Sequence, residues 1–424
     1  MNCDLIIKGK YILPMDEKLT VIKDGFIAVS KNKITTLGEI NEIGKCQAKK
    51  IIDAGNSIIM PGLINTHTHA AMAYFRGLAD DLPLDVWLKE HIFPAEAKYV
   101  NNEFIKKSGK LSCLEMIKSG TTCFNDMYFF GQEILAEVVK TAGLRALLGL
   151  DLKNPGYSVE RVIEIAKQFK DDEFIKIALA PHSVYVCPRE ILEKVKQAAK
   201  AENLRVHIHV SETKKEVEDS IKNNGKSPVE YLDELGLLSD KLMAAHSVWL
   251  SDNDLEIYKN RGVKVAHCPV SNMKLASGVA PVEKMLKSEI SVGLATDGAA
   301  SNNTQDLFTE MRVCALLHKV SNLNPAVVSA REVVKMATIN GAKVIGMEKE
   351  IGSLEVGKKA DIITVGLNKP HLMPIYDPYS HLVYCANGAD VKNVIVNGKV
   401  IMKNREVKTL DEDKILAEAV KFKI

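Results

Sequence analysis

The 424-residue sequence lacks the features that mark secreted, membrane-spanning or nucleic-acid-binding chains. Its eight cysteines are scattered and form neither a C-x-x-C pair nor a dense framework, as expected for reduced thiols. No apolar run is long enough to span a bilayer, and the start, MNCDLIIKGKYILPMDEK, carries charges too early and too often for a signal sequence. A net charge of +2 gives no electrostatic reason to expect nucleic acid or a membrane as a partner. These absences indicate a cytoplasmic protein.

A Gly-rich phosphate-binding turn is also missing, although an open doubly wound sheet usually has one after its first strand. Instead, near-continuous apolar strands alternate with amphipathic helices such as PREILEKVKQAAKAE. This pattern favours a parallel sheet, and eight strands predict a closed (β/α)8 barrel, with the open sheet as the alternative. The candidate strands are SIIMPGLINTH, TTCFNDM, RALLGLDL, IKIALAPHS, RVHIHVSE, LMAAHSV, VKVAHCPVS and SVGLATDG.

Both ends of the chain look like β-structure. DLIIKGKYI, GFIAVSKNKITTLG and KKIIDA precede the barrel, while KADIITVG and KNVIVNGKVIMKNREV follow it, the last with a two-residue hairpin signal at Asn397-Gly398. Neither end has enough strands for a stable sheet of its own, so we expect the two ends to pair. The predicted division is a small β-sandwich from residues 1–57 and 355–424 and a catalytic barrel from residues 58–354.

Polar residues end nearly every candidate strand, and in a parallel barrel these ends share one rim. His67 and His69 point to the same side of an extended strand, because side chains alternate with period two. With His209 and Asp297 they give three imidazoles and one carboxylate, a set that suits Zn²⁺ and also Fe²⁺ or other first-row ions. A single histidine is equally compatible with a hydrogen-bonded core residue. The whole set is not, because each uncompensated buried polar group costs a few kcal/mol.

Three side chains at this rim suit proton transfer. Glu212, three residues beyond His209 in HVSE, fits a general acid near the metal, with a solvated charge in the run SETKKEVED as the alternative. His246 interrupts an apolar strand, where it meets either the attacking water or, as a core histidine, the backbone. Asp297 ends another apolar strand, where an unpaired carboxylate is unfavourable.

These parts predict metal-assisted hydrolysis. A divalent ion lowers the pKa of water from 15.7 towards ~7 to 9. Asp297 and His246 take the proton from that water and aim it at an electrophilic carbon. Glu212 then protonates the adjacent nitrogen, and an amine leaves. The residues alone do not fix the leaving group.

The segments PGLINTHTH, HVSE, AAHSV, HCPVSNMKL and TDGAASNN, in this order, resemble the amidohydrolase superfamily. More narrowly, they resemble its 5′-methylthioadenosine/S-adenosylhomocysteine deaminases, and LEVGKKADIITV is similar to the return segment of the family's sandwich. The resemblance spans almost the whole chain. It implies a barrel with a sandwich built from both termini, in agreement with the strand pattern.

The resemblance also implies roles for individual residues. One metal ion is bound at His67, His69, His209 and Asp297, and His182 stands where binuclear relatives place a bridging lysine, which favours a single ion. Glu212 then contacts the purine ring nitrogen, and His246 is the base that orients the water.

A nucleoside pocket follows from the same resemblance. In LDVWLKEHIFPAEAKY, Trp87 packs against the nucleoside and Glu96 binds the ribose hydroxyls, although a helix anchor and a solvated charge are the respective alternatives. His182 reaches the sugar or its 5′ substituent, and Ser301 and Asn302 line the rim. The reaction implied is conversion of a 5′-modified adenosine (methylthioadenosine, S-adenosylhomocysteine, 5′-deoxyadenosine or adenosine) to the inosine derivative, with release of ammonia.

The sequence departs from the family at one arginine. Some relatives carry an arginine at the end of the third strand that meets the homocysteine carboxylate, and Leu150 stands at that place here. Arg161, in SVERVIEIAKQF, matches a second family arginine. Without the first arginine, a methylthio group or hydrogen is as compatible as homocysteine.

Other functions remain open at this point. Guanine or cytosine deamination and the hydrolysis of triazines use the same scaffold and the same proton-transfer pair, but Trp87 and Glu96 favour a ribosyl substrate. A non-catalytic metal-binding or scaffold protein is a rival from another class, and it is expected to lack at least one of the proton-transfer residues. The resemblance further implies a homo-oligomer.

We predict that the purified protein converts adenosine or a 5′-modified adenosine to the inosine derivative and that a chelator abolishes this activity. The absorbance change of the purine ring measures it, with and without chelator. Full activity after exhaustive demetallation contradicts the metal-dependent mechanism.

Overall fold

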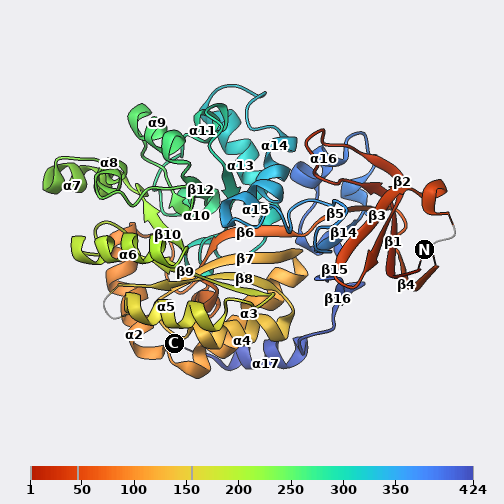
Figure 1. The fold of residues 1–424 in the computed structure, drawn as a ribbon, viewed down its shortest axis with the longest axis horizontal. Helices are drawn as coiled ribbons and strands as arrows, with labels where there is room; N and C mark the ends of the chain where they lie inside the picture. The colour runs from red at the N-terminus through yellow and green to blue at the C-terminus, as the bar shows by residue number, and fades with distance from the viewer. Residues whose placement is uncertain (1, 45–46, 154–155, 424) are drawn as a thin grey trace.

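Two β-sheets organise residues 2–44, 47–153 and 156–423, which the computed structural model describes (Figure 1). Eight parallel strands from the middle of the sequence form one sheet, and nine strands from the two ends form the other. Figure 1 places the terminal sheet at one side of the parallel sheet, and strands from both ends of the chain pair within it.

The parallel strands neighbour one another in sequence order and close into a barrel. Between the first and the last strand, the Thr66 hydroxyl donates to the Leu294 carbonyl (2.9 Å) and the Asp297 N–H donates to the His67 carbonyl (3.0 Å). The predicted (β/α)8 barrel is confirmed, and the alternative of an open sheet is wrong. The strands are β6 (Leu63–Thr68), β7 (Thr121–Tyr128), β8 (Arg145–Asp151), β9 (Ile175–Ala180), β10 (Arg205–Val210), β11 (Leu242–His246), β12 (Lys264–His267) and β13 (Val292–Leu294).

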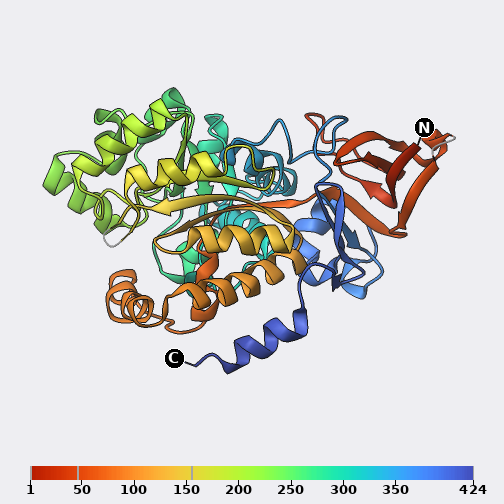
Figure 2. The same ribbon diagram turned by 60° about the horizontal axis from the view of Figure 1, so that its bottom comes forward.

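Helices connect these strands and cover the outside of the barrel (Figures 1 and 2). Their starts follow local capping chemistry: for example, the Asn101 side chain accepts the N–H groups of Glu103 and Phe104. The segments after β6 are η2 (Ala70–Phe75), α1 (Leu84–Val86), η3 (Trp87–Ile92), α2 (Phe93–Tyr99) and α3 (Asn102–Lys118). Those after β7 to β10 are α4 (Gln132–Ala142), α5 (Val159–Gln168), α6 (Arg189–Ala201), α7 (Lys214–Asn224) and α8 (Pro228–Glu234). Those from β11 to β14 are α9 (Asp252–Arg261), α10 (Pro269–Lys274), α11 (Val282–Lys287), α12 (Ala299–Asn302), α13 (Leu307–Ser321), α14 (Ala330–Met336) and α15 (Ile339–Ile345).

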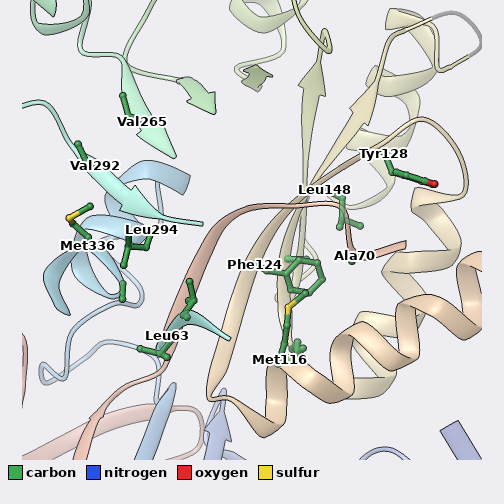
Figure 3. Packing of buried hydrophobic residues seen from close by; sticks show 14 of the residues in the cluster. Leu63, Ala70, Met116, Phe124, Tyr128, Leu148, Val265, Val292, Leu294 and Met336 are labelled. Atoms are coloured by element: carbon green, nitrogen blue, oxygen red, sulfur yellow. The ribbon is translucent and has the colours of Figure 1, made fainter. Parts of the chain in front are cut away.

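The largest hydrophobic cluster lies between the barrel strands and these helices (Figure 3). Phe124 of β7 packs near Met116 of α3, and Leu294 of β13 lies towards Met336 of α14. The barrel strands are buried on both faces, and β8, β11 and β12 are accordingly apolar except at their ends. β6 and β7 instead carry several buried polar residues, among them Asn65, Asn125 and Asp126.

The terminal sheet has the order β17-β16-β15-β14-β5-β1-β2-β3, and β4 also pairs with β1. Ile7 and Ile27 share one hydrophobic core with Ile362 and Ile395, so the two ends of the chain stabilise each other as predicted. The N-terminal elements are β1 (Asn2–Ile12), β2 (Ile22–Ser30), β3 (Lys33–Glu39), η1 (Ile40–Ile43), β4 (Gln47–Asp53) and β5 (Ser57–Pro61). The C-terminal elements are β14 (Ile362–Gly366), η4 (Pro370–Leu372), α16 (Pro378–Ser380), η5 (His381–Cys385), η6 (Gly388–Asp390), β15 (Val391–Val396), β16 (Lys399–Lys403), β17 (Glu406–Val407) and α17 (Glu412–Lys421).

The predicted hairpin at Asn397-Gly398 is present. Both residues have positive φ (52° and 74°) between the paired strands β15 and β16, as a tight hairpin turn requires. The last helix, α17, leaves the terminal sheet and packs on α3 of the barrel, where Lys118 donates to the Glu412 carboxylate (2.8 Å; Figure 2).

One predicted strand is two strands in the structure. The run SIIMPGLINTH divides at Gly62 into β5, which pairs with β1 and β14, and β6, which opens the barrel. A side chain at residue 62 would overlap Thr122, so the crossing point requires glycine. The terminal sheet thus continues to Pro61, and the predicted division of the chain at residues 57/58 and 354/355 stays a prediction.

A buried ion pair joins the barrel to the terminal sheet, and we predict that breaking it is costly. Arg145 Nε lies 2.7 Å from Asp361 Oδ2, and the same guanidinium donates to Asn397 Oδ1 (2.8 Å). Arg145→Met should lower the free energy of unfolding by ~3–5 kcal/mol, because it leaves a buried carboxylate unpaired. Denaturant unfolding measures this.

The double variant Arg145→Met/Asp361→Leu should recover part of the loss, since it buries no lone charge. Arg189→Met, which breaks an exposed pair with Glu193, is the control and should cost less than about 1 kcal/mol. Equal effects of the buried and the exposed substitution would contradict the assigned role of Arg145.

Candidate active site

Polar side chains from four distant parts of the chain meet at the carboxyl end of the barrel. The ring of His67 is the centre of this cluster, with ring centroids of His69, His209 and His246 at 4.9, 5.0 and 5.5 Å. Asp297 follows β13 and joins them, with Oδ1 at 3.3 Å from Nε2 of both His67 and His69. The predicted convergence of these strand ends is therefore what the structure shows.

Three of the imidazoles lie close enough together to hold a metal ion. Ligand atoms of His67, His69 and His209 all lie within 4.8 Å of one another. The other nitrogen of each ring is engaged elsewhere, because Nδ1 contacts His207 Nε2 (2.8 Å), the Met127 carbonyl (2.6 Å) and the His182 carbonyl (2.7 Å), respectively. Such contacts fix the ring orientation and leave Nε2 available for a metal ion.

The electrostatics of the cluster fit a cation. Burial lowers the pKa of His67 to about 4, so that ring is neutral at pH 7, and its buried Nε2 lies 3.3 Å from Asp297 Oδ1. Burial also opposes protonation of His69, but the hydrogen bond and charge of Asp297 outweigh it and raise the pKa to about 9. The negative charge of Asp297 thus stabilises a positive charge placed between the Nε2 atoms of His67 and His69. Three imidazole nitrogens and one carboxylate are a donor set suited to a divalent first-row ion.

Asp297 is held rigidly. Gly298 N–H donates to Oδ1 (2.7 Å), while the hydroxyls of Ser271 and Ser301 donate to Oδ2 (2.6 and 2.9 Å). Burial disfavours its charge, but the hydrogen bonds and charges of His67 and His69 hold the pKa of Asp297 well below its usual range. The residue adopts a left-handed backbone (φ 63°), a conformation that non-glycine residues adopt rarely and often at functional sites.

Glu212 and His246 face each other beside the ligand set. Glu212 Oε2 lies 3.8 Å from His246 Nε2, and both side chains are buried. Burial raises the pKa of Glu212, which suits a group that holds a proton to donate near neutral pH. His246, also with positive φ (69°), has Nδ1 2.9 Å from Asn272 Oδ1, so Nε2 is the nitrogen that faces Glu212.

A pocket of about 630 Å³, partly open to solvent, extends from this cluster. His69, His209, Glu212, His246 and Asp297 form its polar end. One wall is apolar and comes from η2, α1, η3 and α2, with the side chains of Met72, Leu84, Trp87, Leu88, Ile92 and Phe93. A ligand with an apolar body and one polar edge matches this lining.

Most of the predicted substrate-binding residues line this pocket. Trp87, Glu96, His182 and Ser301 are all in its wall. Trp87 also donates its indole N–H to the Ala79 carbonyl (3.0 Å), which fixes the ring in place. Glu96 is nearly buried, so the alternative of a solvated charge is wrong.

Two of the predicted residues lie elsewhere. Arg161 is on the outer face of α5, half exposed, where it pairs with Glu133 (3.1 Å) and Glu164 (3.0 Å), and it does not line the pocket. Asn302 is buried behind the rim and donates to the Thr296 carbonyl and to Glu310 (2.6 Å each). It therefore supports the loop after β13 rather than the pocket wall.

The structure adds residues that the sequence did not single out. Asp151 at the end of β8, Lys153 after that strand and Tyr185 after β9 line the pocket, and burial raises the pKa of Asp151 to about 6. Lys153 Nζ lies 3.6 Å from Glu96 Oε2. Asp151 ends its strand like the other site residues and was visible in the sequence, whereas nothing in the pattern marked Lys153 or Tyr185.

Comparison with known proteins gives consistent results along the whole chain. The profile of the amidohydrolase family matches residues 58–401. A protein of Methanosarcina acetivorans named 5′-deoxyadenosine deaminase is 48% identical, over 98% of this chain and 96% of its own. The 5-methylthioadenosine/S-adenosylhomocysteine deaminase of Thermodesulfovibrio yellowstonii is 46% identical, over 99% and 98%. The solved structure of an adenosine deaminase from Xanthomonas campestris with bound zinc is 35% identical with a TM-score of 0.96, over 99% and 98%. These similarities confirm the predicted resemblance.

We predict that the protein binds about one divalent ion per chain through the clustered imidazoles and Asp297. His209→Ala and Asp297→Ala should lose most of the bound metal, because each removes one donor. His207→Ala should weaken binding by roughly 10–100-fold, because it removes only the contact that orients His67. Elemental analysis after dialysis measures the metal content.

His91→Ala is the matched control, because His91 lies in η3 and is not one of the clustered histidines. Unchanged metal content in His209→Ala, or an equal loss in His91→Ala, would contradict the assigned ligand set.

Proposed function

Because the chain belongs to the amidohydrolase family, we propose that it is a metal-dependent hydrolytic deaminase of 5′-modified adenosines. The reaction replaces the 6-amino group of the purine by oxygen and releases ammonia. The reaction class predicted from the sequence, hydrolysis of a C–N bond in a cyclic amidine, is confirmed by the relatives. Methylthioadenosine, S-adenosylhomocysteine, 5′-deoxyadenosine and adenosine are the candidate substrates.

One observation carries the proposal: an acid, a base and a metal-ligand set share the polar end of a pocket whose wall is apolar and contains Trp87 and Glu96. An indole beside a purine and a carboxylate beside ribose hydroxyls are complementary to a nucleoside. Glu212 and His246 at the far end then face the base rather than the sugar.

The cofactor we propose is one Zn²⁺ ion, with Fe²⁺ or another first-row ion as the alternative. His67, His69, His209 and Asp297 would hold it, and the zinc in the Xanthomonas campestris structure supports this choice. When bound, the ion supplies Lewis acidity that lowers the pKa of water to near neutrality.

The two carboxyl groups divide the proton transfers between them. Asp297 stays ionised, because its pKa lies well below the usual range, and with His246 it orients the attacking water and accepts its proton. Burial raises the pKa of Glu212 and so favours its protonated form, and Glu212 donates a proton to the ring nitrogen next to the reacting carbon. Environments that push two carboxyl pKa values apart are typical of an acid and a base in one site.

The 5′ end of the substrate meets a pocket wall without arginine. Among the described lining residues Lys153 is the only lysine or arginine, and its ammonium already pairs with Glu96. The lining therefore supports small uncharged 5′ substituents at least as well as homocysteine.

A homo-oligomer and a cytoplasmic location remain predictions from the sequence. In the described part of the chain, the search for a helix with the length and hydropathy of a membrane span finds none.

We predict that a panel of adenosine, 5′-deoxyadenosine, methylthioadenosine, S-adenosylhomocysteine and guanine shows turnover of 5′-modified adenosines. Glu212→Gln should lower kcat by ~10²–10⁴-fold with metal content retained, because a general acid contributes about this factor. Ammonia release and the purine absorbance measure both results.

Glu202→Gln, at the exposed end of α6, is the control and should leave kcat unchanged. Activity confined to guanine, or to triazines in an extended panel, would contradict the proposed substrate. An unchanged kcat in Glu212→Gln would contradict the proposed acid.

A further inference from the structure

A second buried glutamate lies behind the proposed general acid. Glu216 does not line the pocket, yet its carboxylate accepts two backbone N–H groups, from Ser211 at Oε1 (2.9 Å) and from Glu212 at Oε2 (2.7 Å). We propose that Glu216 is a positioning residue that aims Glu212 at the substrate. This inference rests on the proposed role of Glu212.

The local sequence explains why a glutamate is in reach. Thr213-Lys214-Lys215-Glu216 has the T-x-x-E pattern of a helix start, and Thr213 accepts the Glu216 N–H (3.1 Å) as the N-cap of α7. In a capping box the glutamate side chain accepts the N–H of the N-cap residue itself. Here it accepts instead from the two residues before Thr213, so the carboxylate supports the loop that carries Glu212.

The loop that carries Glu212 contains a strained residue, Ser211, which is hydrogen-bonded through both its N–H and its carbonyl group. Ser211 has a left-handed backbone (φ 52°), which a non-glycine residue keeps only when its surroundings enforce it. Its N–H donates to Glu216, and its carbonyl accepts the N–H groups of Val248 (3.0 Å) and Trp249 (2.9 Å). Val248 and Trp249 follow His246 at the end of β11.

The same residue therefore joins the loops that carry the proposed acid and the proposed base. Glu216 accepts the N–H groups of Ser211 and Glu212, and the loop after His246 donates to the carbonyl of Ser211. Together these bonds maintain the 3.8 Å approach of Glu212 Oε2 to His246 Nε2. Without Glu216, two buried N–H groups lose their acceptor and Ser211 is free to relax.

Burying the carboxylate of Glu216 also has a free-energy cost, because burial disfavours its charged form. Burial raises its pKa to about 7, although the two backbone N–H groups oppose this shift. A solvated carboxylate in the first turn would cap α7 without that penalty. The burial is thus explained by the loop contacts rather than by the helix.

The test is Glu216→Gln, which keeps the side-chain volume but replaces one acceptor oxygen by an N–H₂ group that cannot accept. We expect kcat to fall by ~10²-fold, since a misplacement of about 1 Å costs this factor. KM and metal content should stay within about threefold, because the pocket wall and the ligands are untouched. Glu218→Gln, on the exposed side of the same helix, is the matched control and should leave kcat unchanged.

A double-mutant cycle separates positioning from folding. In a Glu212→Gln background, Glu216→Gln should change kcat by less than about threefold, because the group that it aims is already absent. The same fractional loss in both backgrounds, or no loss in the single variant, overturns the inference while leaving the proposed function intact. An unchanged kcat in Glu212→Gln overturns both. Should Glu216→Gln fail to fold, Glu216→Asp, which withdraws the carboxylate by one methylene, serves in both arms with the same expected losses.

Discussion

Asp297 is the residue on which both the closure of the barrel and the geometry of the site depend. Its backbone N–H donates to the His67 carbonyl and so helps to close the barrel between its first and last strands. Its side chain meets Nε2 of His67 and His69 at 3.3 Å and draws positive charge to that point. Because one residue makes both contacts, closing the barrel in this register also brings Asp297 to His67 and His69. A barrel that closed in another register would bring these histidines to the wrong place.

Burial then gives the titratable groups of this site different chemistry. Asp297 is held ionised by its imidazole neighbours, Glu212 is pushed towards its protonated form, and His67 remains neutral. These differences come from position alone, since the two carboxyl groups have similar pKa values in water. Both His246 and Asp297 have a positive φ, and their side chains are held by Asn272 of α10 and by the N–H of Gly298, respectively.

Prediction from the sequence succeeded wherever a pattern had one physical meaning. Apolar strands ending in His67, His69, His209, His246 and Asp297 required a shared rim, and the structure brings these residues together. Prediction failed where the same stretch of sequence was compatible with more than one arrangement. The run before His67 reads as one strand, but it changes sheets at Gly62, which periodicity does not register. Arg161 was chosen because it matches a family arginine, but it lies on the exposed side of α5, where it pairs with Glu133.

The sequence by itself determined the barrel, the pairing of the two ends and the polar residues that end the barrel strands, because alternation, period and residue type can be read from short stretches of sequence. Only the tertiary structure decided which long-range neighbours hold these groups: Ser271 on Asp297, Asn272 at His246, Lys153 beside Glu96. Such contacts depend on how far helices and loops turn after each strand. The direction of these helices and loops is set by packing across the whole barrel, so it cannot be read from any short stretch of the sequence.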